Sequence, residues 1–139
     1  MIQIIAGEKG KGKTKILLDK VNADILNTTG SIVYLDKSTK HMYELSNKVR
    51  LINVRDYCVE NSKEFLGFIC GIISQDHDLQ KVFLDSFLKI ACTDENDIAP
   101  VIEKLEMISS KFEVDFILSI SMDQDALPET AKKYVTVSL

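Results

Sequence analysis

Tryptophan is absent from this sequence of 139 residues, and proline and cysteine are scarce, with two and three residues respectively. So little proline argues against linkers and disordered segments, and we expect the whole chain to be folded. The cysteines, Cys58, Cys70 and Cys92, are odd in number, far apart and without CxxC spacing. They therefore indicate neither a disulfide framework nor a zinc site, and we interpret them as buried structural thiols.

Long apolar runs and an excess of positive charge are missing too. No apolar run approaches 18 residues, and the first one, residues 2–6, is too short for a signal peptide and follows no basic segment. We therefore expect a cytoplasmic protein without a membrane span. The net charge of -4 gives no general support for nucleic-acid binding. The length predicts a single domain over residues 1–139.

Short apolar runs alternate with helical patterns along the chain. The runs are rich in Ile, Val and Phe and cover residues 2–6, 32–35, 51–54, 82–84, 114–120 and 134–139. Most lack clean polar alternation, which is typical of strands buried on both faces of a parallel sheet. Spacings of three and four predict helices near residues 14–25 and 98–108. This alternation predicts an α/β fold, a three-layer sandwich around a mostly parallel sheet of five to six strands.

Two of the predicted helices carry further local signals. Asn96 or Asp97 is the expected N-cap of the helix near residues 98–108, and Pro100 falls in its first turn, where its missing donor costs little. The segment 62–74 is apolar nearly all round and places Gly67 and Gly71 on one face. Small residues so arranged predict a close contact with another helix.

A lysine-rich segment near the start carries the chemistry. Residues 7–14 read GEKGKGKT and match the phosphate-loop, or Walker A, pattern GxxxxGK[ST]. An apolar run precedes them and a helical pattern follows, as the pattern requires. Glycines let the backbone wrap around an anion at a helix N-terminus whose dipole favours negative charge. Lys13 is expected to reach the β and γ phosphates, and the Thr14 hydroxyl to bind Mg²⁺.

The segment as a whole is the predicted nucleotide contact. Its members are Gly7, Glu8, Lys9, Gly10, Lys11, Gly12, Lys13, Thr14 and Lys15. Lys9 and Lys11 are open to two interpretations: they contact phosphate directly, or they are solvated loop charges.

Two aspartates compete for the acidic role that a phosphate loop needs beside its metal. Asp85 follows the buried run VFL and resembles a Walker B element, although it could instead cap the next turn. Asp36 closes the run SIVYLD. In small-molecule kinases of the P-loop superfamily, a carboxylate in that position often works near the metal or the acceptor. We assign the metal to Thr14 and Asp85, and a catalytic role to Lys13 and Asp36.

On these motifs the chain resembles the P-loop NTPase superfamily, in its RecA-like branch with additional strands. The resemblance implies the strand order 5-1-4-3-2 and a polar residue that senses the γ phosphate at the end of the strand after Walker B. Ser119, or Ser121, stands at that position, although alternating hydroxyls on a strand are often structural. The resemblance implies ATP and Mg²⁺ as ligands, and ATP is preferred to GTP because no NKxD motif is present.

The chain departs from hydrolysing members of that branch in one respect. Ser86 stands beside Asp85 where those members usually carry a glutamate, and a hydroxyl is a poor general base. Arg50 and Arg55, the two arginines, lie near no finger motif, and we expect them to pair with surface carboxylates. We also expect no lid or substrate domain beyond Leu139. A second copy of the chain or a partner subunit is therefore expected to supply catalytic groups.

Three functions remain open on the sequence. The first is a Mg-ATP-binding protein that acts as a slow or partner-dependent ATPase or as a nucleotide switch. The second is an ATP-dependent transferase: Asp36 suits a small-molecule kinase, and GEKGKGKT is similar to the phosphate loop of the cobalamin (corrinoid) adenosyltransferases. The third is a nonhydrolysing nucleotide-binding interaction protein, which the missing glutamate favours.

Overall fold

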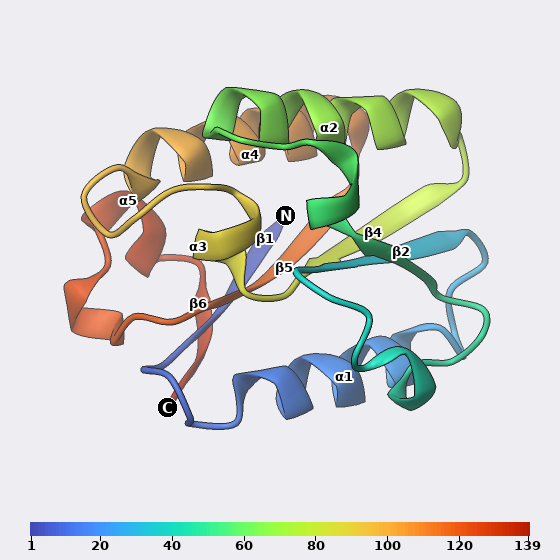
Figure 1. The fold of residues 1–139 in the computed structure, drawn as a ribbon, viewed down its shortest axis with the longest axis horizontal. Coiled ribbons are helices and arrows are strands. Elements are labelled where there is room, and N and C mark those ends of the chain that lie inside the picture. Colours follow the sequence, from blue (N-terminus) through green and yellow to red (C-terminus); the bar gives the residue numbers. More distant parts are fainter.

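Six parallel strands form one sheet in a computed structural model that describes residues 1–139 (Figure 1). The strands are β1 (Ile2–Ala6), β2 (Ser31–Asp36), β3 (Arg50–Asn53), β4 (Leu79–Leu84), β5 (Asp115–Ile120) and β6 (Val135–Ser138). Their order across the sheet is β3-β2-β4-β5-β1-β6. If the edge strand β3 is set aside and the others are renumbered along the chain, the order reads 5-1-4-3-2. The expected order is confirmed, with one strand added at the edge.

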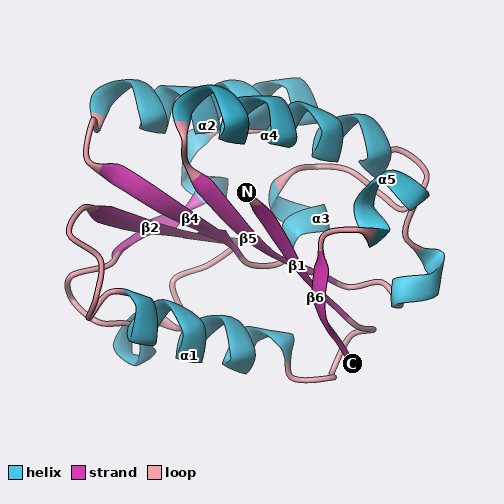
Figure 2. Ribbon diagram, turned by 180° about the vertical axis from the view of Figure 1, so that it is seen from behind, coloured by secondary structure: helices cyan, strands magenta, loops and turns pink.

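Helices cover both faces of the sheet and complete the predicted three layers. They are α1 (Lys13–Asp24), α2 (Ser62–Gln75), α3 (Phe87–Ile90), α4 (Ile98–Phe112) and α5 (Glu129–Lys132). Three short 3-10 helices are η1 (Met42–Glu44), η2 (Val54–Tyr57) and η3 (Gln124–Ala126). Helix α1 lies on one face, and α2, α3, α4 and α5 lie on the other (Figures 1 and 2). None of these helices combines the length and the apolar character needed to cross a bilayer.

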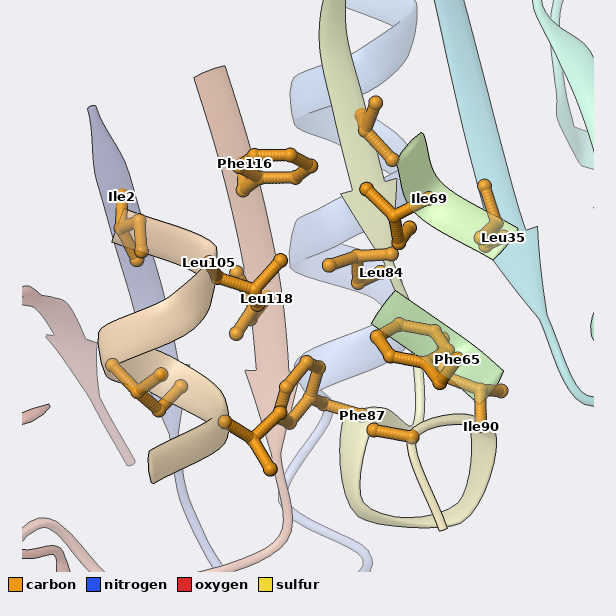
Figure 3. Packing of buried hydrophobic residues seen from close by; sticks show 14 of the residues in the cluster. Ile2, Leu35, Phe65, Ile69, Leu84, Phe87, Ile90, Leu105, Phe116 and Leu118 are labelled. Carbon is orange, nitrogen blue, oxygen red and sulfur yellow. The ribbon is translucent and has the colours of Figure 1, made fainter. Parts of the chain in front are cut away.

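The sheet separates two apolar clusters, one on each face. The larger has 29 buried residues and lies under α2 and α4, and the smaller has 10 and lies under α1. Neighbouring residues of one strand go to opposite clusters: Ile4 belongs to the larger and Ile5 to the smaller. Burial on both sides explains why the strands read as continuous apolar runs. In the larger cluster the Phe65 and Phe87 rings meet edge to face, 5.9 Å apart (Figure 3).

Two expectations about buried small residues are wrong. Gly67 and Gly71 lie on the exposed face of α2, and nothing lies within 4 Å of where a Cβ would stand on either. They therefore make no close helix contact. Cys58 and Cys92 are exposed and Cys70 is half-buried, so the cysteines are not buried core thiols.

Helix α4 begins where the sequence predicts but is capped differently. Asp97 occupies the N-cap position, yet its side chain makes no capping hydrogen bond. Instead the Asp94 carboxylate accepts hydrogen bonds from the N–H groups of Asn96 and Asp97, at 2.9 and 3.0 Å. Pro100 lies in the first turn as expected.

The carboxyl ends of the strands gather the chemically important segments at one edge of the sheet. Strand β1 leads into the loop 7–12, β2 ends at Asp36, and β4 is followed at once by Asp85. Ser119 lies near the end of β5, which separates β4 from β1. In open α/β sheets this edge is where ligands bind.

Candidate functional site

The loop 7–12 turns the chain from β1 into α1, and two of its glycines make that turn. Gly10 and Gly12 have φ angles of 86° and 91°, in the left-handed region that glycine adopts without a Cβ penalty. Gly12 is also the N-cap of α1. Gly7 has another reason to lack a side chain, because a Cβ there would stand 3.0 Å from Cβ of Leu139.

Lys13 folds back over this loop. Its side chain is 7% exposed, and Nζ donates a hydrogen bond to the carbonyl oxygen of Glu8 at 3.0 Å. Burial lowers the pKa of Lys13, and the negative charge of Asp85 opposes that shift. The ammonium group is thus held at the loop and is tied to no carboxylate.

Asp85 is the most heavily hydrogen-bonded side chain of the site. Its carboxylate is 2% exposed. Oδ1 accepts hydrogen bonds from Ser119 Oγ at 2.6 Å, from the Ser86 N–H at 2.9 Å and from Thr14 Oγ1 at 3.3 Å. Oδ2 accepts from the Tyr34 hydroxyl at 2.8 Å. The N–H group of the adjacent residue and three hydroxyl groups from α1, β2 and β5 therefore fix one buried carboxylate.

The Tyr34 hydroxyl is a permanent donor in this network. The ring is fully buried and stacks on Phe83 with centroids 6.3 Å apart. Burial raises the pKa of Tyr34 well above its ordinary value, and the charge and hydrogen bond of Asp85 raise it further. The phenol therefore keeps its proton at any physiological pH.

Ser119 and Ser86 lie next to Asp85 and to each other. Ser119 is 1% exposed, and its hydroxyl, besides donating to Asp85, accepts the Ser86 N–H at 3.0 Å. Ser86 has a φ of 54°, unusual for a residue other than glycine, at the start of α3. The structure thus gives Ser119 a supporting contact to Asp85, and its predicted nucleotide contact stays a prediction.

Asp36 lies at the end of β2 but outside the pocket that the other groups form. It is 2% exposed, and Oδ1 accepts the Lys37 N–H at 2.7 Å. Burial raises the pKa of Asp36; the Lys37 N–H opposes this, and the charge of Asp85 adds to it. The carboxyl is absent from the pocket wall, so its predicted catalytic role lacks direct access to a ligand there.

A pocket of about 390 Å³ opens above these groups. Its wall consists of Lys9, Gly10, Gly12, Lys13, Thr14, Lys37, Lys40, Asp85, Ser86, Leu88, Lys89, Ser119 and Ser121. Five of these residues are lysines, none of them in an ion pair, while Asp85 is the one acidic residue and Leu88 the one apolar residue. Such a lining suits a compact polyanion.

The pocket unites part of the predicted set and leaves part of it out. Gly7, Glu8, Lys11 and Lys15 do not line it. Lys15 instead forms an ion pair with Asp19, at 3.3 Å on the outside of α1.

Sequence reasoning missed three lysines of the wall. Lys37 and Lys40 follow β2, and Lys89 lies in α3. The ammonium group of Lys37 lies close enough to lower the pKa of Lys89, and the charges of Lys9 and Arg55 add to the effect. For Lys37, the sequence did contain a signal: this lysine directly follows Asp36, which was already expected to lie at the site.

The two arginines do not behave as expected. Neither Arg50 nor Arg55 forms an ion pair, so the expected pairing with surface carboxylates is wrong. Arg55 follows β3 in η2 and contributes positive charge near Lys89.

The oxygen ligands present fit Mg²⁺ bound together with phosphate. No three His, Cys, Asp or Glu side chains converge into a metal cage. Mg²⁺ usually takes only one or two protein ligands and fills its remaining positions with water and phosphate oxygens. Thr14 Oγ1 and Asp85 Oδ1, 3.3 Å apart, are hard oxygen ligands of that kind. The Thr14 and Asp85 assignment is chemically consistent with the structure.

Comparison with known proteins identifies the fold and goes no further. No family model matches the chain, and no curated protein does. Among solved structures, it is similar to the flagellar accessory protein FlaH from Methanocaldococcus jannaschii, with a TM-score of 0.60 and 15% sequence identity. The match covers 93% of this chain and 63% of that chain. The chain therefore has a RecA-like P-loop fold and spans less than two thirds of that relative's length.

Proposed function

We propose that this protein binds Mg-ATP in the lysine-lined pocket and acts as a slow or partner-dependent ATPase, or as a nucleotide switch. The observation that carries the proposal is the site itself: left-handed glycines at the N-terminus of α1 open onto five unpaired lysines. A helix N-terminus with inward N–H groups and a lysine is a preferred binding site for phosphates. The likeness to FlaH supports a nucleotide-binding fold of RecA-like type.

The residues of the site have separable roles in this proposal. Gly10 and Gly12 shape the phosphate loop, and Lys13 exchanges its bond to the Glu8 carbonyl for phosphate oxygens. Thr14 and Asp85 would hold Mg²⁺, which would supply positive charge to neutralise the phosphates. Ser119 keeps Asp85 in place through the 2.6 Å hydrogen bond.

Slow turnover follows from the groups beside Asp85. Ser86 reaches the pocket but cannot serve as an efficient general base at neutral pH. Asp36, the other carboxyl considered for that role, lies outside the pocket wall. A second copy of the chain or a partner subunit is therefore the proposed source of a base, and the cytoplasm the proposed location.

Calorimetric titration of the purified protein with Mg-ATP tests the binding proposal. Lys13→Ala should weaken binding by about tenfold or more, because the lysine makes a charge-assisted contact to phosphate. Lys48→Ala is the matched control, since Lys48 is exposed, lies outside the pocket and forms no ion pair. An affinity unchanged by Lys13→Ala would refute the proposal. Phosphate release measured on the same samples separates an ATPase from a binding protein without turnover.

A further inference from the structure

The lysines of the pocket come from two parts of the chain, both of which line the pocket together with Asp85. One is the phosphate loop with Lys9 and Lys13. The other, here called the far wall, consists of Lys37 after β2 and Lys89 in α3. The sheet order β2-β4-β5-β1 puts the strand ends that carry Asp85 and Ser119 between Lys37 and the phosphate loop, and Lys89 follows Asp85 by four residues in α3.

No ion pair neutralises the far wall, although the charge of Lys37 also acts on the neighbouring Asp36 carboxyl. Neither lysine forms an ion pair, and the ammonium group of Lys37 lies close enough to disfavour the charge of Lys89. Arg55 adds a third positive charge near Lys89. Like charges gathered in a pocket are relieved by an anion that bridges them, so this wall is built to receive one.

The position of the wall indicates which anion it receives. A phosphate loop with its lysine cradles the phosphates nearest to it. Asp85, which accepts a hydrogen bond from Thr14 Oγ1, lies at the end of β4, two strands away from β1. Whatever lies beyond Asp85 meets the end of the phosphate chain. The single apolar residue of the pocket, Leu88, and the absence of any aromatic ring leave the lysines facing phosphate and not a base.

We propose that Lys37 and Lys89 bind the terminal phosphate of the bound triphosphate and distinguish it from a diphosphate. In phosphoryl transfer an arginine often supplies this charge. Here two lysines of the same chain would supply it, one from the end of β2 and one from α3. The inference rests on the proposed function, because it requires a nucleotide in the pocket.

The test compares the affinities of Mg-ATP and Mg-ADP in Lys37→Gln and Lys89→Gln, with Lys48→Gln as control. Each far-wall variant should bind Mg-ATP about tenfold more weakly, as expected for a lost charged hydrogen bond, and Mg-ADP less than about twofold more weakly. The control should leave both affinities unchanged. Tripolyphosphate and pyrophosphate should show the same contrast without any base.

Each other outcome overturns the proposal. Equal losses for ATP and ADP would mean that the lysines contribute only a general positive field. Unchanged ATP affinity would mean that the far wall does not contact the nucleotide. The wall would then be free to bind an anionic second substrate. Wild-type protein that binds neither nucleotide would refute the proposed function as well, so the two failures are distinguishable.

Discussion

At the scale of single residues, the hydrogen bond between Tyr34 and Asp85 accounts for the burial of both polar groups. A carboxylate with 2% exposure persists as an acceptor only if donors surround it, and Tyr34 is the one donor to Oδ2. The sequence places Asp85 correctly because it directly follows a buried run. It does not reveal Tyr34 as its partner, because the contact joins residues 51 positions apart on neighbouring strands.

Tyr34→Phe should lower the free energy of unfolding by about 2 kcal/mol, because Oδ2 of the buried carboxylate loses its partner. The phenylalanine keeps the stacking on Phe83. Tyr43→Phe is the control, since Tyr43 is 92% exposed and its hydroxyl has no partner in the protein. Urea denaturation measures both variants, and equal stability of the two would contradict the network described here.

Asp36→Asn should stabilise the protein at neutral pH and lose that advantage in acid. Burial raises the folded-state pKa of Asp36 above its ordinary value, so ionisation costs the folded state free energy. The folded state bears this full cost at pH values above the raised pKa of Asp36. The cost disappears at pH values below the pKa of the same carboxyl in the unfolded chain. Asparagine avoids it and can still accept the Lys37 N–H.

Urea denaturation over the range from about pH 7 to about pH 3.5 checks the Asp36 prediction, and the difference between variant and wild type should shrink as the pH falls. Asp125→Asn, at an exposed position, provides the baseline. A variant less stable than wild type at pH 7 would show that the ionised carboxylate contributes more through its contacts than burial costs it.

At the scale of elements, the sequence predicts what local patterns determine. The six strands and the helices α1, α2 and α4 follow from apolar runs and spacing, and the phosphate loop follows from its glycines. The four-residue helices α3 and α5 escape such reasoning because they are too short to show a period. The far wall escapes it as well, because Lys37 and Lys89 become neighbours only when β2 and β4 pair.

Gly67→Ala should stabilise helix α2 by about 0.5–1 kcal/mol. The position is an exposed helix interior with open space around a new Cβ, so alanine gains helix propensity without a clash. Gly12→Ala is the contrasting variant and should destabilise the protein, since its φ of 91° suits only glycine. Thermal unfolding of both decides the matter. If Gly67→Ala were destabilised, the result would indicate a close helix contact at Gly67 and would contradict the open space around it in the structure.

At the scale of the whole molecule, net charge and local charge have opposite signs. The chain carries a net charge of -4, yet its pocket holds five lysines and one aspartate. Composition alone therefore hides the anion site. The net charge says nothing about a single concave region, because only folding brings the lysines together.

Salt should weaken Mg-ATP binding several-fold between about 0.05 and about 0.5 M sodium chloride, as screening reduces the attraction of the lysines. The net negative charge of the protein would produce the opposite trend, since salt would then screen a repulsion. Titration calorimetry at matched free Mg²⁺ gives the sign directly. An affinity that rises with salt would show that the net negative charge of the protein, and not the pocket lysines, determines the electrostatic contribution to binding.

The burial of Tyr34 gives this protein an internal reporter. Of the four tyrosines, Tyr34 alone is fully buried, and its hydroxyl is bound to the carboxylate that also binds Thr14. Any ligand that draws Thr14 away redistributes charge on Asp85, and the ring of Tyr34 registers the change. Nuclear magnetic resonance of tyrosine-labelled protein would then detect occupancy of the phosphate loop through one resolved signal, without any dye or added probe.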